Sequence, residues 1–418
     1  MTVYITSIFI HMDHFSFIQN YVNKMKVIQE KILSFIENQD SNEETLTDII
    51  NYIDQEKIRE NPHDLRLLLQ IISQISKCHY RHQNFFGKIT KILQKLKEEI
   101  RSMLTNQEIY VIFKFSLPIL IFLNEEGLFN FDENILYFIN SYESVAPYFF
   151  PEFKKYFGNC QEKYNYIVRC LKKNHPNIFE EIEKDEFNEK RKNGESDSYL
   201  CELIQKDSVE EFISFVNRSN LSLSETAIKL TCFETNFLIL NEISMIEYAA
   251  FYGSIQIFQY LKMNGVQLTP SLWPYAIHSK NQEIIRLLEE NKVEPEDKTF
   301  NECFLLALQC HHNEVAQYIH DNLMTSVNRH LIHHSLLFFN FSYLSSKIEE
   351  NKEIFNDAEF LKVFFNDLCS NDCYVLVDYL LNNMDIDINA HVIILVMIIF
   401  NTISIDISFL YYFKSSLF

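Results

Sequence analysis

Apolar residues recur every three or four positions through much of the first half of the chain, with polar residues between them. That spacing is typical of amphipathic helices that bury one face. Local start signals accompany it. Ser41-Asn-Glu-Glu44 and Thr105-Asn-Gln-Glu108 have the spacing of a capping box, and Asn61-Pro62 places a cap before a first-turn proline. The pattern predicts helices at about residues 13–38, 43–60, 62–78, 84–104, 106–124, 131–140 and 161–173.

The second half of the chain repeats one pattern several times. Ser244-Met-Ile-Glu-Tyr248-Ala249 is matched in the next copy by Ser271-Leu-Trp-Pro-Tyr275-Ala276. A third copy follows with Ala307 in the place of the second copy's alanine, and two weaker copies continue around Leu336 and Leu368. Each copy closes on an asparagine: Asn264, Asn291, Asn322, Asn351 and Asn383. Recurrence in one register indicates a repeated structural unit.

Each copy predicts two short helices joined by a turn. A single helix pair cannot bury its own apolar face, so neighbouring pairs must stack, and the array grows as a solenoid. Residues 200–216 fit a divergent first pair. Asparagine often replaces glycine in the left-handed position that ends a helix, so we expect the five asparagines to adopt that conformation.

Composition shifts divide the chain into regions. The polar run at 180–198 lacks an apolar stripe at its C-terminal end, which is typical of a linker or an exposed helix end. We therefore expect an all-α protein with an N-terminal helical leader domain at residues 1–190, followed by a helix-pair solenoid at 199–390. Residues 391–418 are rich in Ile and Phe and predict a degenerate C-terminal repeat or an aggregation-prone tail.

One copy of the repeat resembles a known family. Ala249-Ala250-Phe-Tyr-Gly253-Ser254, followed by the apolar positions of a second helix and by Asn264-Gly265, resembles an ankyrin repeat. Residues 244–320 also resemble the uncharacterised domain found before ankyrin arrays in protist proteins, and residues 13–190 are similar to the leader of those proteins. The resemblance implies an ankyrin-like solenoid for protein binding. The copies are more closely spaced than the family's repeat of about 33 residues.

Composition excludes several classes of function. The 418 residues include only 6 Gly and 8 Pro, and no two glycines are closer than 12 positions, so no GxGxxG, P-loop or GxSxG motif exists. The net charge is −20, and residues 199–418 contribute −15 of it with 13 basic and 28 acidic side chains. Such a charge repels phosphate backbones, so we expect no nucleic-acid binding. A basic protein partner fits it better.

Cysteine and histidine raise a metal hypothesis. The nine cysteines have no disulfide-framework spacing, which predicts reduced thiols in an intracellular, cytoplasmic protein. Cys303, Cys310 and six histidines crowd into residues 303–334, and Cys369-x3-Cys373 has a ligand-like spacing, yet no histidine pair follows at finger spacing. We therefore expect no metal, no cofactor and no enzymatic activity. A Cys310–His278 thiol site is the catalytic alternative.

Two apolar runs are too short for membrane insertion. Lys114 and Pro118 interrupt the run at 111–123, and the run at 392–400 is nine residues long, against about 20 needed to cross a bilayer. The apolar stretch before Met12 lacks the basic flank of a signal peptide. A second start at Met12 would remove residues 1–11.

The resulting prediction is a scaffold or adaptor that binds another protein on the concave face formed by the first helices and their turns. A self-assembling structural protein is the alternative. Aromatic residues dominate binding hot spots, although core packing is the ordinary role of each one here. The residues expected on the binding face are Phe251, Tyr252, Ser254, His278, Lys280, His311 and His312.

Overall fold

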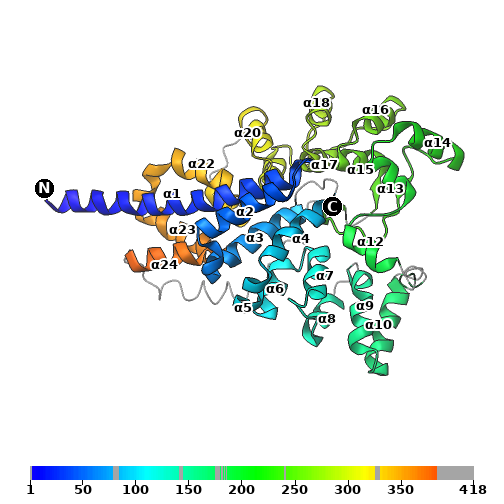
Figure 1. Ribbon diagram of the computed structural model, residues 1–418. Helices are drawn as coiled ribbons and strands as arrows, with labels where there is room; N and C mark the ends of the chain where they lie inside the picture. Colours follow the sequence, from blue (N-terminus) through cyan, green and yellow to red (C-terminus); the bar gives the residue numbers. More distant parts are fainter. Residues whose placement is uncertain are drawn as a thin grey trace. The chain divides into compact units, whose positions relative to one another are not determined.

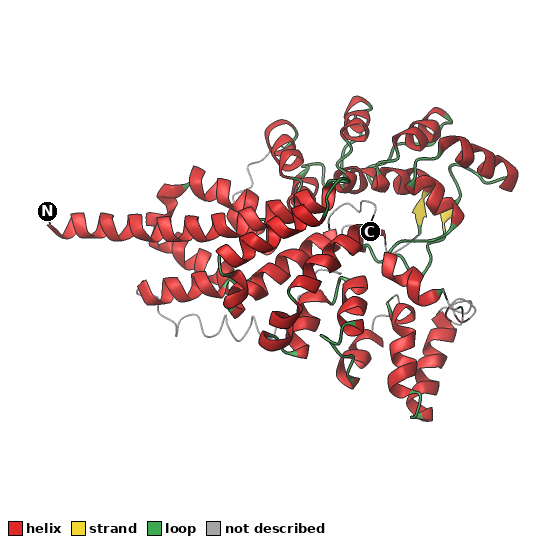
Figure 2. Ribbon diagram, in the orientation of Figure 1, coloured by secondary structure: helices red, strands yellow, loops and turns green. Residues whose placement is uncertain are grey.

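The structure is a computed structural model, and it describes residues 2–78, 84–140, 145–174, 186–239, 242–324 and 330–383, with isolated positions at 179, 182 and 184 (Figure 1). Within this part of the chain, 23 α-helices account for nearly all regular structure. The described residues contain two strands, β1 (Ala227–Ile228) and β2 (Ile243–Ser244), which pair antiparallel (Figure 2). The all-α class predicted from the sparse glycine and proline is confirmed.

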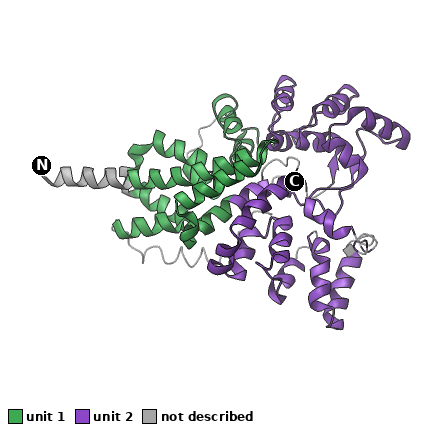
Figure 3. Cartoon of the chain, viewed as in Figure 1, with its two compact units in different colours: residues 1–71, 296–418 green, residues 72–295 purple. Residues whose placement is uncertain are grey.

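The chain forms two compact units, shown in green and purple in Figure 3. Unit 1 combines residues 1–71 with 296–418, and unit 2 comprises 72–295. The boundary expected between residues 190 and 199 therefore falls inside unit 2. The first helix, α1 (Thr2–Glu37), packs along α22 (Phe341–Glu350), so sequence-distant segments share unit 1. This pairing depends on side chains far apart in the sequence, such as Gln29, whose Nε2 donates to the Phe339 carbonyl at 2.6 Å.

Most of the N-terminal helices start close to where they were predicted, with a correction at one of the caps. Thr105 caps its helix as expected: its Oγ1 accepts from the Glu108 amide, and Glu108 Oε2 accepts from the Thr105 amide at 2.8 Å. At the preceding signal the cap is Asn42, whose Oδ1 accepts from two backbone amides, while the Ser41 hydroxyl donates to the Phe35 carbonyl. The other N-terminal helices of unit 1 are α2 (Glu43–Gln55), η1 (Ile58–Glu60) and the start of α3 (Pro62–Cys78).

Two of the predicted helices are each split in two. The stretch predicted at 106–124 breaks before Pro118, because proline has no N–H for the bond to the carbonyl four residues earlier. The stretch at 84–104 breaks at Leu96. The splits give α4 (Phe85–Lys95) with α5 (Lys97–Met103) and α6 (Asn106–Phe113) with α7 (Leu117–Glu125). The helices that follow in unit 2 are α8 (Glu133–Asn140), η2 (Ala146–Phe149), α9 (Phe150–Phe157), α10 (Gln161–Asn174) and α12 (Phe187–Asn193).

Six helix pairs follow, three in each unit. In unit 2 they are α13 (Tyr199–Gln205) with α14 (Val209–Ser219), α15 (Met245–Tyr252) with α16 (Ile255–Met263), and α17 (Leu272–Ser279) with α18 (Gln282–Glu290); the short η3 (Phe237–Ile239) lies between the first two pairs. In unit 1 they are α19 (Asn301–Gln309) with α20 (Asn313–Asn322), α21 (Leu331–Leu337) with α22, and α23 (Ala358–Ser370) with α24 (Tyr374–Asn383); η4 (Lys352–Asn356) precedes the last pair.

Successive pairs pack on each other within a unit. In unit 2, α15 contacts both α13 and α17, and α16 contacts both α14 and α18. In unit 1, α21 contacts both α19 and α23. First helices thus pack on first helices, and in unit 2 second helices pack on second helices.

Three predictions concern the C-terminal tail, the start of the first helix and membrane-spanning helices. The predicted tail at 391–418 lies outside the described residues. The first helix begins at Thr2 instead of near residue 13, so Met12 falls within a helix. None of the helices in the described residues combines the length and the apolar character needed to cross a bilayer.

Candidate functional site

The two helices of every pair are joined by a turn with the same backbone conformation. One residue in each turn has a positive φ, between 50° and 70°, which is the left-handed region that L-residues avoid. Only Gly253 is a residue type that adopts this conformation without strain. The six turn residues are Asp207, Gly253, Lys280, His311, Phe339 and Asp372.

The residue after the turn connects one pair to the preceding pair. Ser254 Oγ donates to the Ile204 carbonyl at 2.5 Å. Asn281 Nδ2 donates to the Gly253 carbonyl at 2.9 Å, and Asn340 Nδ2 donates to the Leu308 carbonyl, also at 2.9 Å. Ser254 and Asn340 are buried, so these bonds replace water that the carbonyls would otherwise bind. Ser254, expected on a binding face, instead holds two pairs together.

The five recurrent asparagines share a role that differs from the expected one. None of them has a positive φ, so the predicted left-handed conformation is wrong; Gly265 and Lys292, one residue later, adopt it in two copies. Each asparagine Nδ2 donates to the carbonyl four residues earlier, at 2.7–3.0 Å. The last turn of a helix leaves its carbonyls without helical partners, and the amide satisfies one of them.

The residues predicted for the binding face in unit 2 are mostly buried. Phe251 and His278 stack with their ring centroids 4.1 Å apart, and both side chains are buried. Asn236, from the segment between β1 and β2, is buried with its Nδ2 3.3 Å from His278 Nε2. Tyr252 is also buried, and its hydroxyl lies 3.4 Å from Gln205 Nε2. A segment of the chain itself therefore covers this part of the first-helix face.

The remaining predicted residues divide between the two units. His311 and His312 are buried in unit 1, at the turn between α19 and α20. Lys280, in unit 2, is partly exposed and occupies a left-handed turn position. Of the seven, only Lys280 presents appreciable surface. The others serve packing and turn formation, which leaves them little area to contact a partner.

Several thiols and histidines have shifted pKa values. Burial raises the pKa of Cys369 to about 11 and also raises the pKa values of Cys303 and Cys373, so these thiols stay protonated. His333 Nδ1 lies 2.7 Å from Asp367 Oδ1, which raises the pKa of His333. Burial lowers the pKa of its neighbour His334 to about 4. No group of three His, Cys, Asp or Glu side chains able to hold a metal occurs in this part of the chain.

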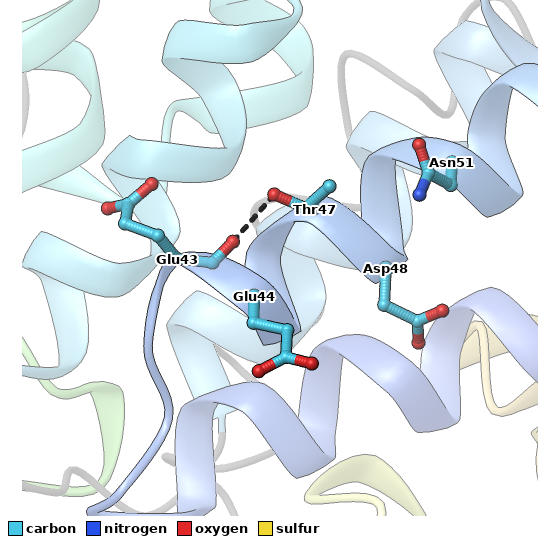
Figure 4. A pocket seen from close by; sticks show the side chains of 5 residues that line it. All are labelled: Glu43, Glu44, Thr47, Asp48 and Asn51. Carbon is cyan, nitrogen blue, oxygen red and sulfur yellow. Dashed lines mark hydrogen bonds between the residues drawn. The ribbon is translucent and has the colours of Figure 1, made fainter.

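One surface depression lies on α2, and its lining comes from a single helix. Figure 4 shows its five residues, with Thr47 Oγ1 donating to the Glu43 carbonyl. Asp48 already pairs with Lys31 of α1. An acidic helix face whose central carboxylate has a cation of its own presents no site for a ligand.

A second depression lies between α20 and α22, the second helices of consecutive pairs in unit 1. Its volume is about 480 Å³. Two carboxylate residues and two tyrosines are among the residues that line it, from two different helices. Its lining residues are Asn313, Glu314, Gln317, Tyr318, Asp321, Ser342, Tyr343 and Ser346. None of them belongs to the predicted binding face.

Comparison with protein-family models, with curated proteins and with solved structures finds no match for this chain. Function therefore has to be argued from the arrangement of the described residues.

Proposed function

We propose that the three helix pairs of each unit stack as divergent ankyrin-like repeats and that their function is to bind another protein. The observation that carries the proposal is the recurrence of one polar scheme. A left-handed turn joins the helices of all six pairs, a polar residue after the turn bonds to the preceding pair in three of them, and an asparagine ends the second helix in five. A scheme that joins each pair to its neighbour is what a stacked repeat requires.

The packing of the helices supports the same proposal. First helices contact first helices in both units, and second helices contact second helices in unit 2. A solenoid built in this way presents an extended surface made of equivalent positions, and such surfaces serve protein recognition.

The outer surface of the second helices is the better binding face. In unit 2 the buried His278, Phe251 and Asn236 leave the first-helix face with little accessible area. The six second helices, by contrast, carry ten acidic and four basic side chains, with most of the acidic ones exposed. An acidic surface steers and orients a basic partner.

Full-length protein is the right bait for a test. A fragment at 199–418 would lack α1 and leave the residues of α22 that contact it, such as Ser342 and Ser345, without their partners. Partners captured from lysate by the wild-type chain are compared with those of a variant in which five exposed second-helix glutamates become glutamine: Glu210, Glu211, Glu283, Glu290 and Glu349.

The matched control changes five exposed glutamates outside the pairs: Glu43, Glu44, Glu60, Glu98 and Glu162. Both variants lose the same net charge. We expect a salt-sensitive partner that the control retains and the second-helix variant loses. Equal capture by all three proteins, or equal loss in both variants, would refute the outer-face assignment.

A further inference from the structure

We propose that the depression between α20 and α22 receives an arginine side chain of the protein partner. This inference rests on the proposed function and specifies the chemistry of that partner. Four features carry it: a hydroxyl without a hydrogen-bond partner among the described residues, two carboxylates that pair with no described lysine or arginine, an exposed aromatic ring, and the equivalent helix of the preceding pair.

The hydroxyl belongs to Tyr343. The residue is only 4% exposed, and its hydroxyl has no hydrogen-bond partner among the described residues. Burial, together with the nearby carboxylates of Glu350 and Asp321, raises the pKa of this phenol, so it remains protonated. Buried polar groups normally have partners. An unpartnered hydroxyl in the wall of a depression indicates that a polar group from elsewhere is accommodated there.

The carboxylates are Glu314 and Asp321. Gln317 Nε2 donates to both Asp321 oxygens at 2.9 and 2.8 Å, and His320 Nδ1 lies 2.9 Å from Oδ1, so the carboxylate is held in place. Those contacts lower the pKa of Asp321 and keep it ionised. No ion pair joins Glu314 to a described cation. Lys347, the lysine of α22, already pairs with Glu350 at 2.8 Å.

The aromatic ring belongs to Tyr318. It is 42% exposed and lies four residues after Glu314 and three before Asp321, so all three share one face of α20. A ring beside carboxylates favours a planar guanidinium, which stacks on the ring and donates to the carboxylate at once. The carboxylates are separated by two helical turns, about 10 Å at 1.5 Å per residue, which is too far for both to bind one metal ion.

In the preceding pair, an arginine of the chain itself pairs with one of the acidic residues on the second helix, α18. In the alignment of the two repeat copies, Glu283 and Glu290 of α18 correspond to Glu314 and Asp321 of α20. Arg286 stands where α20 has Gln317, and its Nη1 pairs with Glu290 at 3.2 Å. Arg286 thus pairs with one carboxylate of α18, whereas α20 presents the same acidic spacing without an arginine. An arginine supplied by a partner gives α20 the kind of carboxylate–guanidinium pair that Glu290 and Arg286 form on α18.

Fluorescence anisotropy of a labelled peptide tests the proposal on the full-length protein. The probe is an octapeptide with two arginines in a Gly-Ser background, and its control replaces both arginines by citrulline, a neutral analogue of similar shape. We expect the citrulline peptide to bind about tenfold more weakly at low salt, because it loses the charge-assisted contacts.

Three variants locate the binding. Gln317→Arg supplies the missing arginine from the chain, and we expect it to weaken binding of the arginine peptide about tenfold, as does Tyr318→Ala. Both positions reach the surface, and circular dichroism confirms that each variant remains folded. Glu44→Gln with Glu162→Gln, at two exposed positions outside the helix pairs, is expected to leave the affinity unchanged.

Wild-type affinity in Gln317→Arg, or equal binding of the citrulline peptide, overturns the proposal. An equal loss in the variant with Glu44→Gln and Glu162→Gln also overturns it, because the peptide then binds to acidic surface in general. The capture experiment above alters neither Glu314 nor Asp321, so failure there and failure here are distinguishable.

Discussion

The helix pairs and the helices α4–α12 of unit 2 achieve the same helical architecture with different polar chemistry. The pairs reuse a few short-range bonds at fixed positions, as in the asparagine amides that each satisfy a carbonyl four residues earlier. Helices α4–α12 depend on single interactions that occur once. Arg191 forms a buried bidentate pair with Glu152, at 2.7 and 2.8 Å, and also donates to the Tyr148 carbonyl at 3.1 Å.

The two regions differ in how far the loss of one polar bond affects the rest of the structure. In the pairs each polar bond is one of several equivalent ones, so its loss is local and small. In α4–α12 a single buried ion pair joins α12 to α9, and no second copy of it exists among the described residues. Substitutions should therefore rank by whether they affect a unique or a recurrent bond.

The largest effect is expected for Arg191→Ala. Removing one member of a buried pair leaves the Glu152 carboxylate without its cation, which costs about 3–5 kcal/mol. Urea denaturation should show the loss, and hydrogen exchange should place the faster opening in α9 and α12. Lys192→Ala, at an exposed neighbouring pair, should change the stability by less than about 1 kcal/mol. Equal effects of the two substitutions would show that the buried pair is not the anchor of these helices.

An intermediate effect is expected for Asn340→Ala. The fully buried amide donates to the Leu308 carbonyl at 2.9 Å and to Asn313 Oδ1 at 2.7 Å, and its Oδ1 accepts from the Tyr343 amide at 3.0 Å. Leaving those groups unpaired should cost about 2–3 kcal/mol in a denaturation experiment.

Asn340→Asp separates the two roles of this residue. Aspartate still accepts from the Tyr343 amide, as a helix cap does, but it cannot donate to the Leu308 carbonyl. A stability equal to that of wild type would mean that the bond between pairs contributes nothing and that capping explains the whole effect.

The smallest effect is expected for Asn291→Ala. Its amide donates to the Leu287 carbonyl at 2.7 Å from an exposed position, where water can replace it. The loss should be about 0.5–1 kcal/mol, measured as a shift of the thermal midpoint against Gln282→Ala, an exposed change on the same helix. A loss comparable to that of Asn340→Ala would remove the distinction between recurrent surface bonds and buried ones.

Local signals in the sequence predicted most of the helices, whereas contacts between distant segments could not be predicted from the sequence. Thr105 and Glu108 are three residues apart and form their capping box as expected. The five asparagines could be found by recurrence alone, yet their backbone conformation could not, because an amide can satisfy a carbonyl without entering the left-handed region. The grouping of α1 with the last helices follows from packing between segments far apart in the sequence, for which no local pattern exists.

Residue type alone could not show whether the residues predicted for the binding face are accessible, for a similar reason. Phe251 and His278 have the residue types of a binding surface, and only the fold reveals that Asn236 lies against them. The depression between α20 and α22 did leave a signal in the sequence. Arg286 and Gln317 occupy the same position in consecutive repeat copies, and the exchange of a cation for an amide between two acidic residues marks the copy that lacks its own counter-charge.

The pairing of α1 with α22 also determines how late in synthesis the first helix can be buried. The apolar stripe of α1, including Ile18, Val22 and Met25, is fully buried in the finished protein. Its partner helix begins at Phe341, roughly 300 residues later, and at about 5–20 residues per second the ribosome needs about 15–60 seconds to reach it. During that interval the first helix emerges with its partner not yet made. This exposed stripe makes the N-terminus of the nascent chain prone to aggregation until α22 has been translated.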